Sequence, residues 1–214
     1  MKERRKQGYS AIEKHPHGLE NPVDKIKRWK RNIAFACQRV RYGYCERDVW
    51  SIDWWFLNVV PNMLQELKET KHGYPDALST SDHNSQRLIT DEAEKEEEGS
   101  KKWDAILSEM IFLFREANEE TCRKKNPYEE QYEKCSDEFI KKYGFFGEKL
   151  KTKEEMEEEK EKRYKRWYTL GDVPEYQNIQ NKYLKEEQKI DQYRNECKNK
   201  GLELFSKWFW SLWD

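Results

Sequence analysis

The chain has 214 residues, enough for a domain with an enclosed core, and is 39% charged and 36% hydrophobic with a net charge of −1. Thirty aromatic residues, among them nine Trp, supply much buried area per residue, so the high charge does not indicate a disordered chain. No apolar run approaches the ~20 residues that span a bilayer, which excludes a transmembrane helix. Five cysteines without a CxxC pair or a secretory leader predict reduced thiols in a cytoplasmic protein.

The charge is distributed unevenly along the chain. Residues 1–47 contain 13 basic and 5 acidic residues, whereas residues 48–100 contain 4 basic and 12 acidic residues. We expect the basic N-terminal third to meet phosphate groups, or else the acidic segment of its own or a neighbouring chain.

A helix is predicted to follow a flexible or docked arm over residues 1–20. Asn21 is a good N-cap, Pro22 suits the first helical position, and Gly43 ends the helix near Tyr42. Apolar residues recur along it at three- and four-residue spacing and predict a buried stripe. The stripe is formed by Ile26, Trp29, Ile33, Cys37 and Val40.

The opposite face of this basic helix is the leading candidate for a binding site. At ~100° per residue it gathers Arg side chains around an aromatic ring, close to the turn that follows. Because Arg binds phosphate bidentately and an aromatic ring can stack on a base, the grouping fits a nucleotide-type anion or a single strand. The predicted ligand-binding residues are Arg28, Arg31, Phe35, Arg39, Tyr42 and Arg47. The alternative is a solvated basic face that pairs with the acidic segment.

The next segment, residues 48–70, is apolar on nearly every side and predicts a central helix enclosed by the others. Asp48 is its expected N-cap. Asp53 would face an apolar surround and is expected to pair with Arg41 or Arg47. Three tryptophans of this helix are expected in the core: Trp50, Trp54 and Trp55.

Two further helices are predicted after a loop over the acidic residues 76–99, of which Asp91–Glu98 could alternatively form a helical extension. The first begins at Ser100 and should pack on the central helix through an apolar stripe. That stripe is Trp103, Ile106, Leu107, Met110, Ile111, Phe114 and Ala117. The second begins at Asn126 and Pro127 and ends before Gly144. Its inward-facing residues are Tyr128, Tyr132, Cys135, Phe139, Ile140 and Tyr143.

The last third of the chain predicts two more helices. Thr152 and Glu155 form a capping box for a charged helix over 153–169, and a long helix follows that Gly201 is expected to break. Since no β alternation is found, the prediction is an all-α protein of about six helices in an irregular, mostly antiparallel bundle. It is expected to form a single domain around the central helix.

The C-terminal segment 202–214 is unusually rich in aromatic residues. If Trp208 and Leu212 face the core, Trp210 and Trp213 point away from it. Self-packing, dimerisation, a ligand pocket and a membrane surface are the open alternatives. The candidate contacts to an oligomer or a partner are Trp208, Trp210 and Trp213.

One set of positions within roughly residues 41–117 carries a family resemblance. It consists of Asp48-Val49-Trp50-Ser51-Ile52-Asp53, Pro61, Leu64, Leu67, Gly73-Tyr74-Pro75, and Trp103-Asp104-Ala105-Ile106-Leu107 with Met110, Ile111 and Phe114. In these residues the chain resembles a family of small bacteriophage proteins without an assigned activity. The resemblance implies an accessory or host-takeover role inside a bacterial host, and it supplies no catalytic residues.

Carboxylates, histidines and cysteines do not form a convincing catalytic set. Glu66 and Glu69 fit one acidic pair of the all-α, Mg²⁺-dependent nucleotide pyrophosphohydrolases, but no second pair is found. The four histidines fall in predicted loops, and no Gly-rich phosphate loop or activated Cys is found. The sequence therefore favours a protein that is not an enzyme and holds no metal or cofactor.

The leading hypothesis is a non-enzymatic, homo-oligomeric binding protein that sequesters an anionic nucleotide-type ligand, such as a host immune or signalling nucleotide. Phage-encoded anti-defence activity would fit this role. The alternatives are a protein–protein interaction module that acts on a host or phage protein, and a Mg²⁺-dependent nucleotide hydrolase that uses Glu66 and Glu69.

Overall fold

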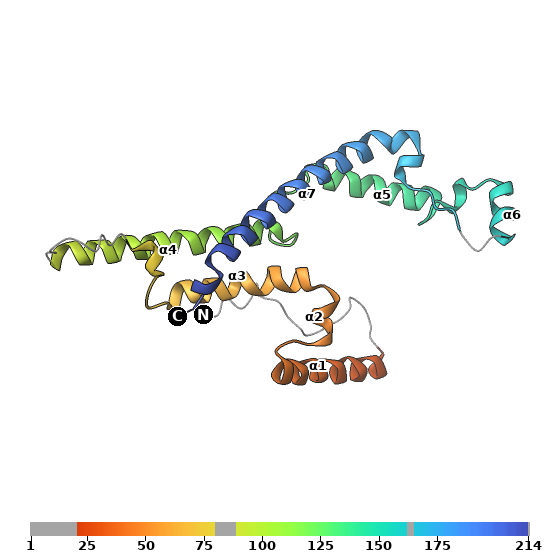
Figure 1. Ribbon diagram of the computed structural model, residues 1–214. Coiled ribbons are helices and arrows are strands. Elements are labelled where there is room, and N and C mark those ends of the chain that lie inside the picture. Colours follow the sequence, from red (N-terminus) through yellow and green to blue (C-terminus); the bar gives the residue numbers. More distant parts are fainter. Residues whose placement is uncertain (1–20, 80–88, 162–164, 214) are drawn as a thin grey trace. The chain divides into compact units, whose positions relative to one another are not determined.

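The computed structural model of the protein describes residues 21–79, 89–161 and 165–213 (Figure 1). These residues contain seven α-helices and no β-strand, which confirms the prediction of an all-α protein with about six helices. The helices are α1 Pro22–Tyr42, α2 Glu46–Trp50, α3 Ile52–Thr70, α4 Ile89–Ala117, α5 Glu129–Tyr143, α6 Lys153–Glu161 and α7 Pro174–Trp208. The predicted arm over 1–20 lies outside the described residues.

The chain divides into two compact units, and α7 contributes to both of them. Met1–Thr121 and Glu196–Asp214 form the first unit, and Cys122–Asn195 form the second. That the two units fold as a single domain stays a prediction. Across the described part of the chain, no helix has the length and apolar composition needed to cross a bilayer.

Helix α1 begins and ends where its sequence predicts. The Asn21 side-chain oxygen accepts a hydrogen bond from the backbone N–H of Val23 at 3.2 Å, and Pro22 occupies the first turn. Gly43 adopts a left-handed conformation with φ of 79°, which glycine tolerates without strain, and its N–H caps the carbonyl of Arg39.

The predicted central helix is divided at Ser51, which separates α2 from α3. Asp48 therefore lies inside α2, where its carboxylate accepts a hydrogen bond from the Cys45 N–H at 2.8 Å, instead of capping the long helix. Only Asn58, Pro61 and Leu64 of α3 are buried, and Trp50 is 90% exposed. The segment 48–70 is thus packed on one side and is not enclosed, because the remaining helices of the first unit cover only that side.

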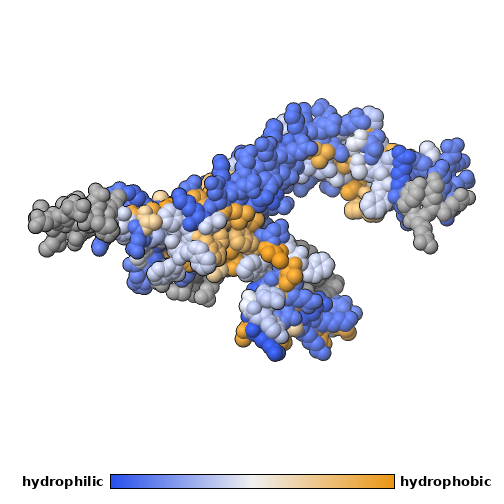
Figure 2. All heavy atoms as spheres, in the orientation of Figure 1, coloured by the Kyte–Doolittle hydropathy of each residue, from blue (hydrophilic) through white to orange (hydrophobic). Residues whose placement is uncertain are grey.

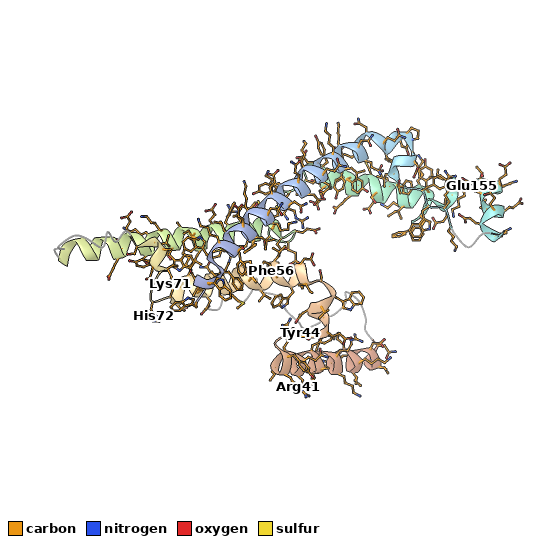
Figure 3. All side chains as sticks on the ribbon, viewed as in Figure 1. Arg41, Tyr44, Phe56, Lys71, His72 and Glu155 are labelled. Carbon is orange, nitrogen blue, oxygen red and sulfur yellow. The ribbon has the colours of Figure 1, made fainter. Side chains whose placement is uncertain are left out.

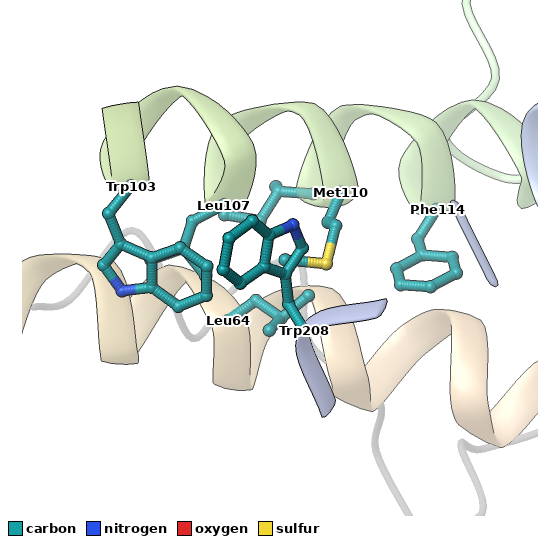
Figure 4. Packing of buried hydrophobic residues seen from close by; sticks show 7 residues of the cluster. Leu64, Trp103, Leu107, Met110, Phe114 and Trp208 are labelled. Carbon is teal, nitrogen blue, oxygen red and sulfur yellow. The ribbon is translucent and has the colours of Figure 1, made fainter. Parts of the chain in front are cut away.

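The core of the first unit forms where α3, α4 and α7 meet (Figure 4). It consists of Leu64, Trp103, Leu107, Met110, Ile111, Phe114 and Trp208. The Trp103 and Trp208 rings lie 5.4 Å apart, and the Phe114 ring meets Phe56 edge-on at 5.2 Å. The predicted stripe of α4 is therefore confirmed as the main packing surface on α3.

Helix α4 begins at Ile89, so the acidic segment that the sequence predicts as a loop is helical from residue 89 onward. Residues 80–88 of that predicted loop lie outside the described chain. Acidic side chains near a helix N-terminus are favourable for the helix dipole. Glu97 and Glu98 also form ion pairs one turn onward with Lys101 and Lys102, each at 2.7 Å. The apolar pattern begins only at Trp103, so it gave no sign of this charged part of the helix, and the helical alternative for Asp91–Glu98 is the one that the structure shows.

The second unit has its own small core between α5, the chain before α7 and the first turns of α7. It contains Phe139, Leu170, Val173, Tyr176 and Ile179, with Tyr128, Tyr132, Cys135, Ile140 and Tyr143 packed against it. The predicted inward face of α5 is confirmed, although the helix begins at Glu129. The Asn126 side-chain oxygen accepts a hydrogen bond from the Tyr128 N–H at 2.9 Å just before this helix, and its side-chain amide donates to the Tyr183 carbonyl at 3.0 Å, which joins α5 to α7.

The predicted capping box of α6 is confirmed, but the helix is shorter than the sequence suggests. The Thr152 N–H donates to Glu155 at 2.9 Å and the Glu155 N–H donates to Thr152 at 3.2 Å. The helix ends at Glu161, and residues 165–169 are not helical. The Tyr168 hydroxyl donates to Glu155 at 2.6 Å, and this hydrogen bond lowers the pKa of that carboxyl. The chain thus folds back along α6 instead of continuing it.

Helix α7 continues through Gly201, where the sequence predicts a break. A Cβ at this position would lie 2.9 Å from the Phe114 ring and 3.4 Å from the Leu113 Cβ. Gly201 is therefore a point of close approach between α7 and α4. The absence of a side chain allows the contact, which outweighs the weak helix propensity of glycine.

Gly201→Ala is expected to destabilise the first unit by about 1 kcal/mol. Alanine gains about 1 kcal/mol in helix propensity, but it forces a methyl group into the buried Phe114 ring, and overpacking costs about 1–3 kcal/mol. Chemical denaturation measures the change. Ser206→Ala, an exposed position in the same helix, is the control and should be neutral or slightly stabilising.

Candidate functional site

In helix α1, the face predicted to be buried is exposed, and the face predicted to be open is half-buried. The predicted buried stripe is exposed: Trp29 by 61% and Val40 by 91%, with Ile26, Ile33 and Cys37 also exposed. Figure 2 shows hydrophobic residues at the surface of α1. The half-buried positions are on the face predicted to be open, and they include Arg28, Asn32, Phe35, Gln38 and Arg39. The prediction of the buried stripe is therefore wrong, although the residues that share a face are those expected.

An ion pair between Arg39 and Asp48 sets this orientation. The Arg39 Nε donates to Asp48 at 3.0 Å and its Nη2 donates to the other carboxylate oxygen. The Asp48 side chain is only 4% exposed, and burial strengthens a bidentate pair with good geometry. The Glu46 N–H also donates to the Gln38 side-chain oxygen at 2.9 Å. Arg39 therefore holds α1 against α2, and it does not line the cleft described below.

A cleft lies between this face of α1, helix α2 and the first turn of α3. It is lined by Arg31, Phe35, Glu46, Arg47, Trp50, Ser51 and Trp54, and its volume is about 630 Å³. That volume falls in the range of small-molecule binding sites, about 300–1,000 Å³. The α1–α2 cleft is the name used below for this site.

The α1–α2 cleft combines cationic and aromatic groups. The Nη1 atom of Arg47 is buried without a hydrogen-bond partner among the described residues. Leaving a charged donor unsatisfied in this way costs free energy, and a change of the Arg47 rotamer that turns Nη1 toward an anionic oxygen in the cleft would remove that cost. Trp54 is held in place, since its indole N–H donates to Glu120 at 3.3 Å. Trp50 lies in the lining with most of its surface open to solvent, so the cleft has an aromatic edge available for stacking.

The structure brings together three of the six predicted ligand-binding residues: Arg31, Phe35 and Arg47. Arg28 is half-buried but does not line the cleft. Tyr42 instead lies 6.4 Å from the Tyr44 ring at the turn after α1, where Figure 3 shows Arg41 and Tyr44. Arg41 packs over the Tyr42 ring at 5.3 Å.

Four lining residues were missed by the sequence analysis: Glu46, Trp50, Ser51 and Trp54. Trp50 and Trp54 were expected in the core of an unbroken helix. Ser51 is the signal that could have found them, because Ser followed by an apolar residue and Asp53 is a typical helix start. Because α3 begins after Ser51, Trp50 belongs to α2 and does not lie on the face of α3 that packs in the core.

Asp53 does not need the buried partner that the sequence predicts. Its side chain is exposed, and the Ser51 hydroxyl donates to it at 2.8 Å, which lowers the pKa of the carboxyl. The predicted pairing of Asp53 with Arg41 or Arg47 is therefore wrong. The buried carboxylate of this region is Asp48.

The C-terminal tryptophans separate as their spacing predicts. Trp208 and Leu212 contribute to the core of the first unit, whereas Trp210 is 87% and Trp213 is 74% exposed. Trp208 is therefore buried, whereas Trp210 and Trp213 are the exposed members of the predicted contact set. Trp213 lines a second cavity of about 330 Å³ that includes Tyr74 and Trp103.

The acidic pair considered for a hydrolase lies at the surface of α3. Glu66 and Glu69 are both exposed, and the Gln65 amide donates to Glu69 at 2.6 Å. In the part of the chain that the structure describes, no group of three or more His, Cys, Asp or Glu residues is placed to hold a metal ion.

The α1–α2 cleft therefore stands out as the candidate functional site, because its lining joins Arg47, whose Nη1 atom is buried without a hydrogen-bond partner among the described residues, to an aromatic edge. Its lining comes from three successive helices and is fixed in place by the Arg39–Asp48 pair. The chain matches no family model, no curated protein and no solved structure.

Proposed function

We propose that the protein binds and sequesters an anionic, nucleotide-type ligand in the α1–α2 cleft. The observation that carries the proposal is the buried Nη1 atom of Arg47, which lacks a hydrogen-bond partner among the described residues and belongs to the cleft lining. Buried polar groups are almost always satisfied, so an unsatisfied one calls for an explanation, and a bound anion is one such explanation for a guanidinium nitrogen. A phosphate oxygen is the natural partner for a guanidinium donor.

The other lining residues fit the remaining parts of a nucleotide. Arg31 lies on the same side of the cleft as Phe35, one turn earlier in α1, and adds positive charge for a phosphate group. The Trp50 ring offers a face for stacking of a base. Glu46 is the acidic residue of the lining, and its carboxylate can accept hydrogen bonds from a ribose hydroxyl or an exocyclic amino group.

The proposed biological setting is a phage-encoded, non-enzymatic protein that removes a host signalling or immune nucleotide from solution. Sequestration needs affinity alone, and a preformed cleft with charge and aromatic surface can supply it. This setting rests on the family resemblance over roughly residues 41–117.

Arg47→Ala is expected to weaken nucleotide binding by about 10- to 100-fold, because a hydrogen bond to a charged group contributes about 1.5–3 kcal/mol. Arg31→Ala should cause a smaller loss and Trp50→Ala a loss of similar size through stacking. Isothermal titration calorimetry with a panel of linear and cyclic nucleotides measures these changes. Arg41→Ala is the matched control, since Arg41 is an arginine of α1 that lies outside the cleft.

The apo protein gives a second readout. Arg47→Met removes the unsatisfied donor and keeps an apolar chain of similar length, so the melting temperature of the apo protein should stay the same or rise. A residue kept for folding would instead lose stability on replacement. No heat with any nucleotide of the panel, or equal affinities for the Arg47→Ala and Arg41→Ala variants, would rule out the proposed function.

A further inference from the structure

Helix α1 exposes a continuous apolar seam on the side opposite the α1–α2 cleft. Ile26, Trp29, Ile33, Ala36 and Val40 form this seam, and each of them is exposed in the described structure. At ~100° per residue, these five positions fall within one sector of the helix about 80° wide. The seam therefore leaves the Arg31 and Phe35 face of α1 untouched, and it is independent of the proposed function.

The spacing of the seam is that of a helix that pairs with one other helix. Ile26, Ile33 and Val40 recur every seven residues, and Trp29 and Ala36 each follow three residues later. These are the a and d positions of a heptad, with β-branched residues at every a position, which favours two-stranded pairing. The seam runs about 21 Å along the helix at 1.5 Å per residue. Such a narrow seam can be covered by one partner helix, and it is too narrow to be the contact face for a broad apolar surface.

The charges beside the seam decide which kind of helix fits. Lys25 precedes the first a position and Lys30 follows the first d position, so basic groups flank the seam on both sides. Lys27 and Arg41 add further positive charge, and Asp24 is the acidic residue of α1. If α1 of a second copy docked in parallel, Lys25 of each copy would lie opposite Lys30 of the other. Like charges at these positions disfavour self-pairing, and acidic side chains favour docking.

We propose that the apolar seam of α1 docks an acidic amphipathic helix of a partner protein. Apolar residues of the partner would pack between Ile26, Trp29 and Ile33, and Glu or Asp residues beside its own seam would pair with Lys25 and Lys30. Helix-in-groove recognition of this kind uses anchors at three- and four-residue spacing. The ion pairs at the rim select the partner and speed association, while the seam provides the buried area.

Synthetic helical peptides of three heptads provide the test with the full-length protein. One peptide carries Leu at a and d with Glu at the flanking e and g positions, and the other carries Lys at e and g. Fluorescence anisotropy should show that the Glu peptide binds at least 10-fold more tightly than the Lys peptide. The double change Lys25→Glu with Lys30→Glu should reverse this preference, because the flanks of the seam then become acidic.

Ile33→Asn should abolish binding of the Glu peptide, whereas Leu184→Asn, at an exposed apolar position of α7, should leave it unchanged. Both positions are exposed, so an unchanged melting temperature is expected for both variants. Equal affinity for the two peptides would overturn the proposal. So would binding to anionic vesicles that Ile33→Asn removes, or a dimer in analytical ultracentrifugation that the same variant dissociates, since those results assign the seam to a membrane or a second copy.

Discussion

Replacing Phe114 by alanine is expected to lower the free energy of unfolding of the first unit by about 3–5 kcal/mol. The Phe114 side chain is fully buried, and its ring lies 5.2 Å from Phe56 and 6.0 Å from Phe205. Helices α3, α4 and α7 all contact it, so movement of one helix cannot close the cavity. Urea denaturation followed by tryptophan fluorescence reports this unit, because only Trp167 lies in the second unit.

Phe112 is the matched control because it lies in the same helix but is 39% exposed. Phe112→Ala should cost about 1 kcal/mol or less, and equal losses for the two variants would contradict the packing described above. The Phe114→Ala background also reverses the sign of the Gly201→Ala change. Removal of the ring takes away the two closest contacts of the added methyl group and leaves the Leu113 Cβ at 3.4 Å, so the helix propensity of alanine then stabilises α7.

Local signals in the sequence predicted the helices more accurately than their burial. Asn21, Pro22 and Gly43 define the ends of α1 because capping depends on the residues beside the helix end. The burial of the α4 stripe was predicted correctly because α3 and α7 happen to cover that face of the helix. The stripe of α1 follows the same periodicity, and yet it is exposed. Periodicity identifies residues that share a face, but it does not say whether another element covers that face.

The candidate site was only partly predictable for the same reason. Arg31, Phe35 and Arg47 were expected from the combination of guanidinium and aromatic groups near the α1 turn. The contribution of Trp50 and Trp54 depends on the break at Ser51, which an apolar run conceals. The structural role of Arg39 depends on Asp48, nine residues away across a turn, and the sequence contains several other acids that could have paired with it.

Arg39→Leu is expected to destabilise the contact between α1 and α2 by about 3 kcal/mol, because it leaves the buried Asp48 carboxylate without its cation. The value is at the low end for a broken buried pair, since the Arg39 side chain is 29% exposed. Amide hydrogen exchange measures the effect directly. Protection should fall throughout α1, while the core residues of α4 keep their protection.

A double-mutant cycle separates the ion pair from the packing of the Arg39 chain. Asp48→Asn keeps an oxygen that accepts the Cys45 N–H but carries no charge, so Arg39→Leu in that background should cost only about 1 kcal/mol. Arg41→Leu, at an exposed position two residues further along α1, should have no effect on exchange. Arg31 and Phe35 belong to α1 and line the cleft. When α1 is no longer held against α2, these two residues lose their fixed position and one wall of the cleft is lost. Arg39→Leu should therefore lower nucleotide affinity without any direct contact between Arg39 and the ligand, and the Asp48→Asn background should restore most of that affinity.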